Sequence, residues 1–142
     1  MFGTMRETFA IELSRDACFA RLAEHRIGRL ALSVNALPTI VPVRYAVIGH
    51  ELLIGEVAEA SIVSALENSV VAFEADTVEN AGGAGWVVCV VGKATEVVDT
   101  ATIAKLRSLP AGTGGSAPRG RYFRVTTERV TGRAAELQQT YG

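Results

Sequence analysis

The sequence predicts a mainly β protein: a small antiparallel β-barrel of six or seven strands with two or three short helices. Several short segments alternate apolar residues with polar or small ones at period two, as at Leu30, Leu32 and Val34, which is the pattern of a half-buried strand. The connections between these segments are short and rich in Gly, Asn and Pro, which favours antiparallel neighbours. With 142 residues, of which 49% are apolar, the chain suits a single domain, 1–142, with one core.

The expected elements follow from local patterns. Ser14 can cap a helix over about 14–24, and Thr100 a short helix that ends before Pro110. Pro42 lies inside an expected strand and cannot donate a ladder hydrogen bond, so that strand should carry an edge or a bulge there. We treat 1–12 as an N-terminal arm, 110–120 as a flexible Gly-rich loop and 135–142 as a tail. The expected strands are 28–34, 39–48, 51–57, 70–76, 86–91 and 122–130, and a further helix is expected at 61–67.

The segment from Trp86 to Val91 is an unbroken apolar run, too short for a typical helix and rich in β-branched residues. Such a strand is usually buried on both faces. A chain with so little helix has few elements to cover a second face, so another subunit could cover it. We therefore expect a homodimer.

The composition of the chain excludes several classes of protein. The net charge of −1 gives no electrostatic basis for binding nucleic acid. No apolar run is long enough to span a membrane, and no signal peptide is visible, so a cytoplasmic location is expected. Cys18 and Cys89 have no metal-ligand spacing, so no metal site is expected. We can name no general acid or base.

The charges are unevenly distributed. Residues 51–92 contain seven acids and no Lys or Arg. The C-terminal part instead carries five arginines: Arg119, Arg121, Arg124, Arg129 and Arg133. These arginines could form a solvated strand face, an anion subsite in which the guanidinium fork binds phosphate, or a surface that meets the acidic stretch of a second subunit.

A series of short blocks carries a family resemblance. Leu13–Cys18, Ile27–Ala31, Val41–Tyr45 and Arg124–Arg133 occur in an order and spacing similar to those of the pyridoxamine 5′-phosphate oxidase-like superfamily. Within it, the chain most resembles small flavin-nucleotide-binding and nitroimidazole-resistance proteins. The likeness covers about residues 12–134.

This resemblance implies a split β-barrel homodimer with FMN, or alternatively a deazaflavin, bound noncovalently in clefts at the subunit interface. Residues of the second expected strand would lie along the flavin ring, and the turn after the third expected strand would hold the phosphate. The cofactor-binding residues implied in this way are Pro42, Val43, Arg44, Tyr45, Val57, Ala58 and Ser61. We also place Trp86 at the cleft, and Arg124 of the C-terminal strand as a further cation.

The phosphate turn departs from that pattern. Glu56 stands where relatives carry Arg, and Ile62 stands where they carry Lys, which leaves Ser61 as a donor. Each lost charge-assisted hydrogen bond removes about 1.5–3 kcal/mol, so FMN binding should be weaker by roughly two to four decades. If both positions flank a surface turn, Glu56→Arg with Ile62→Lys should restore affinity.

Two functions follow from these observations. The first is a flavin- or deazaflavin-dependent oxidoreductase acting on a small molecule, in which the cofactor does the chemistry. The second is a split-barrel dimer with a degenerate phosphate site, which serves as a noncatalytic module or binds another ligand. The altered turn favours the second function, whereas the Val41–Tyr45 block and the Gly-Trp-Val-Val block at Gly85–Val88 favour the first.

Overall fold

The computed structural model describes residues 11–77, 85–109 and 120–135. Of the predicted arm, only β1 falls in this part, and almost all of the predicted loop and tail lie outside it. The strands within it are β1 (Ile11–Glu12), β2 (Ile27–Val34), β3 (Leu37–Ile48), β4 (Glu51–Val57), β5 (Val70–Thr77), β6 (Trp86–Glu96), β7 (Arg121–Val125) and β8 (Arg129–Ala134). The helices are α2 (Arg15–Leu22), α3 (Ala60–Leu66) and α4 (Thr100–Ser108).

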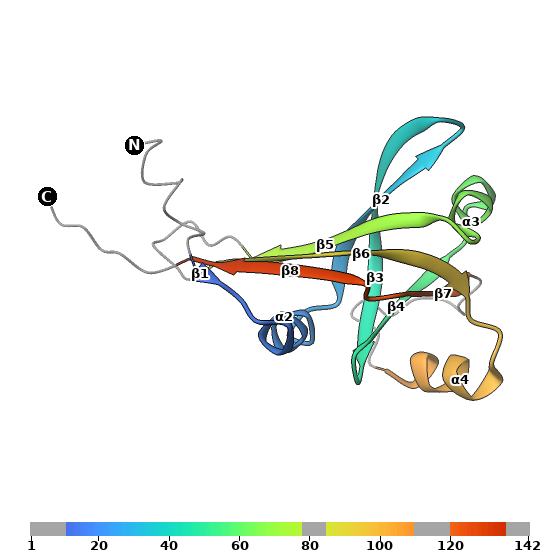
Figure 1. Cartoon of the computed structure of the whole chain (residues 1–142). Helices are drawn as coiled ribbons and strands as arrows, with labels where there is room; N and C mark the ends of the chain where they lie inside the picture. The colour runs from blue at the N-terminus through green and yellow to red at the C-terminus, as the bar shows by residue number, and fades with distance from the viewer. Residues whose placement is uncertain (1–10, 78–84, 110–119, 136–142) are drawn as a thin grey trace, which may run out of the picture.

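Six strands close into an antiparallel barrel in the order β6-β5-β2-β3-β4-β7, and β6 then pairs with β7. The long strand β6 belongs to both halves of the barrel: 86–91 pair with β8, and 94–96 pair with β7. Beyond the barrel, β8 and β1 extend the sheet (Figure 1). The predicted mainly β antiparallel barrel is therefore confirmed.

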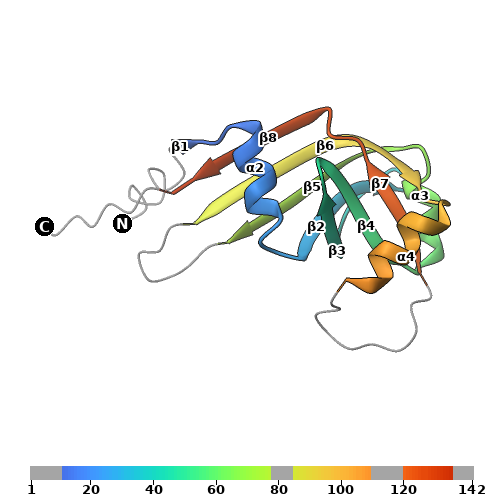
Figure 2. The same ribbon diagram turned by 90° about the horizontal axis from the view of Figure 1, so that it is seen from below.

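Helices α2 and α4 pack on different parts of this barrel, and Figure 2 shows them well separated. Helix α2 contacts β6 and β8, and its buried Cys18, Phe19 and Leu22 enter the main core. Helix α4 packs Ile103 and Leu106 against a smaller cluster that includes Tyr122 of β7. The main core lies inside the barrel, where Leu30, Phe73 and Val90 form one cross-strand row. None of the helices in the described segments is long and apolar enough to cross a membrane.

Two details of the predicted elements are wrong. The segment 122–130 is not one strand, because β7 ends at Val125 and the chain crosses over Gly92 before β8 begins. A Cβ at Gly92 would lie 1.7 Å from the carbonyl oxygen of Thr126, so this crossing requires glycine. The cap of α4 is Asp99 rather than Thr100, since the Asp99 carboxylate accepts a hydrogen bond from the Thr102 amide at 2.9 Å. Ser14 caps α2 as predicted.

The β3 strand has a free edge within a single chain. Among the strands that the structure describes, residues 37–44 pair with β2 alone, and 45–48 pair with β4. Pro42 lies in the first part, opposite Arg29, where its missing amide costs no ladder hydrogen bond on the unpaired side. The predicted edge at Pro42 is thus present.

One side of β6 faces away from the barrel core. Trp86, Val88 and Val90 are buried inside, whereas Val87, Cys89 and Val91 on the other side are only half-buried. The same chain therefore covers one face of this apolar strand, and cover of the second face by another subunit stays a prediction. We call this exposed side the outer sheet face. Its apolar members are Ile27, Ala31, Ile40, Val70, Ala72, Val87, Cys89 and Val91.

Candidate functional site

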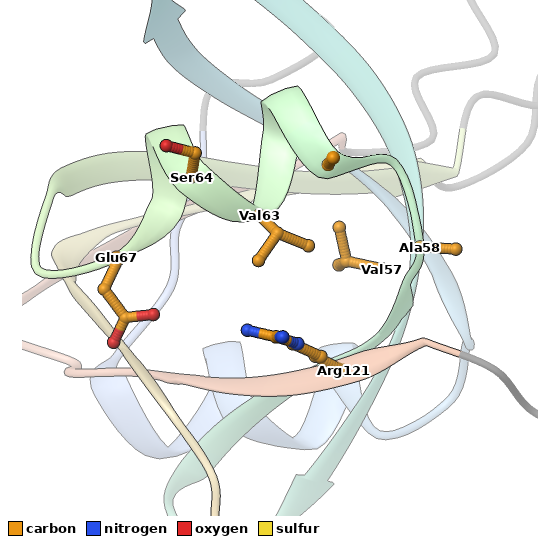
Figure 3. A pocket seen from close by; sticks show the side chains of 7 residues that line it. Val57, Ala58, Val63, Ser64, Glu67 and Arg121 are labelled. Atoms are coloured by element: carbon orange, nitrogen blue, oxygen red, sulfur yellow. The ribbon is translucent and has the colours of Figure 1, made fainter.

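A hollow of about 480 Å³ lies between the end of β4, helix α3 and the start of β7 (Figure 3). It contains two residues of the predicted phosphate turn, Val57 and Ala58, together with Arg121 from the C-terminal part of the chain. Its lining is apolar on one side and charged on the other. The lining residues are Val57, Ala58, Ala60, Val63, Ser64, Glu67 and Arg121.

Strand pairing brings Arg121 to this turn. Val57 and Arg121 are directly opposite each other in the β4–β7 pair, after an irregularity in register that begins at Ile54. Two glycines allow the close approach of these strands. A Cβ at Gly120 would lie 2.7 Å from backbone atoms of Glu56 and Val57, and one at Gly55 would lie 2.0 Å from the Tyr122 ring. The backbone therefore fixes the position from which the Arg121 side chain enters the hollow.

The electrostatics of the hollow depend on one arginine and two glutamates. Nη1 of Arg121 lies 3.5 Å from Oε1 of Glu96, a long contact, and the Arg121 side chain is 59% exposed. In Figure 3 the guanidinium of Arg121 and the carboxylate of Glu67 reach the same end of the hollow. Among the described residues this long contact is the one ion pair of Arg121, and a guanidinium has five N–H donors, so donors remain accessible to an anionic ligand.

The predicted phosphate turn itself offers little to an anion. Glu56 and Ser61 are exposed, and the Ser61 hydroxyl donates to the carboxylate of Glu59 at 3.3 Å. Ile62 is only 5% exposed and belongs to the main core. The expectation that Ile62 flanks a surface turn is therefore wrong, because α3 turns this residue inward. A lysine there would place its charge in the barrel core.

The predicted ring-binding residues of β3 divide between two faces. Val43 and Tyr45 point inward and are buried, while Pro42 is exposed and Arg44 is half-buried. The Tyr45 hydroxyl donates to the carbonyl oxygen of Leu22 at 2.6 Å, and its ring meets Phe73 edge-on at 4.9 Å between centroids. Burial raises the pKa of Tyr45 well above its ordinary value, with a smaller contribution from the charge of Glu24. Tyr45 thus serves this chain's own core, and its side chain is not presented to a ligand within one chain.

Trp86 and Arg124 lie away from the hollow. Trp86 is the first residue of β6, buried, with its ring 5.4 Å from that of His25, whereas the hollow adjoins the region where the other end of β6 pairs with β7. Arg124 forms an ion pair with Glu51 of β4. A single chain therefore brings Val57 and Ala58 together with Arg121, but not with Trp86 or Arg124.

A second group of charges lies on the outer sheet face. Arg29 of β2 contacts Glu74 at 2.8 Å and Asp76 at 3.3 Å, both on β5. Partial burial raises the pKa of Glu74, as do the hydrogen bond and charge of Asp76, while Arg29 opposes the shift. Cys89 is opposite Glu74 on β6, and its thiol pKa is raised by burial and by both acids. In the described segments no three His, Cys, Asp or Glu side chains gather as a metal site would require.

The fold places this chain in the class of small six-stranded antiparallel barrel proteins, here with a hollow beside the β4–α3 turn. Comparison with known sequences then identifies the family. Residues 14–134 match the family described as pyridoxamine 5′-phosphate oxidase, and the chain belongs to that family. The uncharacterised protein Rv0080 of Mycobacterium tuberculosis is 38% identical over 104 residues, which cover 70% of this chain and 68% of that protein.

Solved structures show the same fold over nearly their whole length. The FAD-binding protein from Mycobacterium smegmatis matches with a TM-score of 0.73 and 28% identity, covering 88% of this chain and 98% of that one. An FAD-binding protein from Mesorhizobium loti matches with a TM-score of 0.68 and 25% identity, covering 88% and 97%.

Among the five C-terminal arginines the sequence predicts Arg124 as the cofactor-binding residue, whereas the structure places Arg121 at the hollow. Arg119 lies outside the described residues, and Arg129 and Arg133 lie on β8, opposite Val91 and Val87. Arg121 and Arg124 are three residues apart on β7, so their side chains point to opposite faces of the strand. The register of β7 against β4 places Arg121 opposite Val57 and Arg124 opposite Leu53. An alignment of the segment 120–125 with 52–57 by alternating burial could have supplied this signal.

Proposed function

We propose that this chain is a flavin-nucleotide-binding protein that works as a homodimer and serves an oxidoreductase reaction on a small molecule. The observation that carries the proposal is the match, over nearly the full length of both chains, with two proteins described as FAD-binding. FMN and FAD share the ring and the first phosphate, so the likeness supports a flavin nucleotide, with a deazaflavin as an alternative ring.

A bound flavin would supply hydride or electron transfer, and the chain's residues would bind it, orient it and exclude water. Val57 and Ala58 offer an apolar wall beside the phosphate turn. The half-buried Arg44 and the exposed Pro42 on β3 lie where the family resemblance places the ring. Neither Trp86 nor Arg124 lines the hollow in one chain, and we propose that they join such a site from a second subunit.

The outer sheet face supports the homodimer. Ile27 is 65% exposed, Ile40 73% and Val70 72%, in a face that also contains the half-buried apolar residues of β6. Contiguous apolar patches of this kind mark interaction sites on soluble proteins. The same face carries acids on β5 and the cations Arg129 and Arg133 on β8, so two copies related by a two-fold axis can present complementary charges.

The cofactor experiment begins with protein purified gently without added flavin. Its absorption spectrum and the chromatographic identity of any released flavin establish whether FMN or FAD is bound. Titrations of FMN, FAD and a deazaflavin, followed by fluorescence, then measure each affinity. Stoichiometric binding of one of them supports the proposal, and a folded protein that binds none contradicts it.

The subunit experiment uses two exposed apolar residues. Ile40→Asp places a charge on the outer sheet face and should shift the protein to monomer in sedimentation. Val98→Asp is the matched control, because Val98 is 77% exposed and lies between β6 and α4, outside that face. A stable wild-type monomer at low micromolar concentration would contradict the homodimer.

A second candidate is a dimeric barrel that has lost its phosphate site and acts as a noncatalytic module or binds a different ligand. The acidic surroundings of the turn favour it, since Glu56 and Glu59 are exposed there and Glu67 lines the hollow. A colourless protein that ignores added FMN and FAD but sediments as a dimer would select this candidate.

A further inference from the structure

We propose that Arg121 of β7, rather than a residue of the β4–α3 turn, holds the phosphate of the flavin nucleotide, and that Glu96 limits how tightly it does so. This inference rests on the proposed flavin binding and names the residue responsible for its phosphate specificity.

The hollow has the polarity that such a ligand requires. Val57, Ala58 and Ala60 line its apolar part, and the guanidinium of Arg121 extends beneath Val63 toward the other end (Figure 3). Arginine presents a planar fork that binds phosphate oxygens in pairs, which a serine hydroxyl cannot do. Among the described residues that line the hollow, Arg121 is the one with a positive charge.

Arg121 also supplies a positive charge beside the β4–α3 turn, which has no cation of its own in the sequence. The family resemblance implies cations where this chain has Glu56 and Ile62, and burial of Ile62 excludes a surface charge at that position. The directly opposite pairing of Val57 with Arg121 brings a cation back to the same turn from the neighbouring strand. Gly120 and Gly55 hold this pairing close, because a side chain at either position would collide with β4 backbone or with Tyr122.

Glu96 and Glu67 oppose an anion at this site. Glu96 already lies 3.5 Å from Arg121, and its side chain is 25% exposed, so an incoming phosphate must share or displace this contact. Glu67 reaches the same end of the hollow. Partly exposed ion pairs of this length contribute little, so a dianion can compete for the guanidinium, although with reduced affinity. The structure thus explains how phosphate can bind in an acidic segment.

The test compares FMN with riboflavin, which has the same ring and no phosphate. Wild-type protein should bind FMN more tightly than riboflavin. Arg121→Gln should weaken FMN binding roughly ten- to hundredfold and leave riboflavin binding within about twofold. Arg121→Lys should recover part of the loss, because it restores the charge but not the fork. Arg121 is mostly exposed, so these variants should fold.

Arg21→Gln is the matched control. Arg21 is also an exposed arginine with a long contact, 3.3 Å to Glu24, but it lies on α2, away from α3 in Figures 1 and 2. Its loss should change neither titration. Equal affinity of wild type for FMN and riboflavin, or an equal loss of both ligands in Arg121→Gln, would overturn the role of Arg121 while leaving flavin binding intact. A wild type that binds neither ligand overturns the proposed function and this inference with it.

Glu96→Gln tests the second half of the proposal. It should tighten FMN binding roughly two- to fivefold at low salt and have no effect on riboflavin. In an Arg121→Gln background the same change should give a smaller gain in FMN affinity, because the guanidinium for which Glu96 and the phosphate compete is absent. Identical gains in both backgrounds would show that Glu96 acts by general repulsion and would overturn its role as a competitor for Arg121.

Discussion

The hydroxyl of Tyr45 donates a hydrogen bond of 2.6 Å to the carbonyl oxygen of Leu22, which joins β3 to the last turn of α2. The same carbonyl accepts the amide of His25 at 3.2 Å. The strand that the family resemblance assigns to the flavin ring therefore also anchors the N-terminal helix, and its tyrosine has a structural role in each chain.

Tyr45→Phe should lower the free energy of unfolding by about 1 kcal/mol at neutral pH, the usual net value of a hydrogen bond. The loss stays moderate because the Leu22 carbonyl keeps the His25 amide, and the ring still packs on Phe73. Urea unfolding followed by fluorescence measures the difference. A loss above about 3 kcal/mol would mean that the hydroxyl supports more than this contact.

The raised pKa of Tyr45 also predicts a loss of stability in alkali. The folded state keeps the phenol protonated above the ordinary tyrosine pKa near 10, whereas the unfolded chain releases the proton there. The unfolded state then binds fewer protons, so the free energy of unfolding falls as the pH rises beyond about 10. Urea midpoints of wild type and Tyr45→Phe should therefore converge between about pH 9 and 11. Parallel curves would contradict this prediction.

The sequence predicts most of the barrel, because the alternation of apolar and polar residues indicates most strands and Ser14 indicates the start of the first helix. The failures have physical causes. Residues 122–130 keep the alternation of a strand, whereas the break after Val125 depends on the close approach of Thr126 to Gly92, which the local pattern does not encode. Ile62 lies next to the turn that begins α3, and the direction in which α3 turns this side chain decides whether it is exposed or buried.

The sequence predicts the hollow less well, because the residues that line it come from segments that are distant in the sequence. Arg121 and Val57 are joined by strand register, which local patterns do not encode. Strand pairing also keeps Trp86 and Arg124 away from the hollow, since Trp86 pairs with β8 and Arg124 pairs with Thr95 of β6. Whether they join a ligand from a partner subunit depends on the dimer, which remains a prediction.

The burial of Ile62 changes how the phosphate turn can be tested. Ile62→Lys should lower the free energy of unfolding by about 2–5 kcal/mol, because it removes a core side chain and places an ammonium among apolar groups. Glu56→Arg alone should preserve stability, since Glu56 is exposed, and should raise FMN affinity roughly tenfold by adding positive charge near Val57. Thermal unfolding and FMN titration at two salt concentrations measure both effects. A fully stable Ile62→Lys would contradict the described packing of α3.

The last prediction concerns the glycine before Arg121. A Cβ at Gly120 would approach the backbone of Glu56 and Val57 to 2.7 Å, so Gly120→Ala must push β7 away from β4. We expect a loss of about 1–3 kcal/mol in the free energy of unfolding, as for other overpacked sites, and a loss of FMN affinity of roughly tenfold as Arg121 moves from the hollow. Gly49→Ala is the control. Gly49 has a φ of 65°, and a Cβ there would have no neighbour within 4 Å, so alanine costs backbone strain of about 1–2 kcal/mol without disturbing the hollow. If both variants lose stability but only Gly120→Ala loses FMN affinity, with riboflavin affinity unchanged, the close approach of β7 to β4 positions the phosphate-binding arginine. If Gly120→Ala keeps full FMN affinity, the phosphate does not depend on this approach.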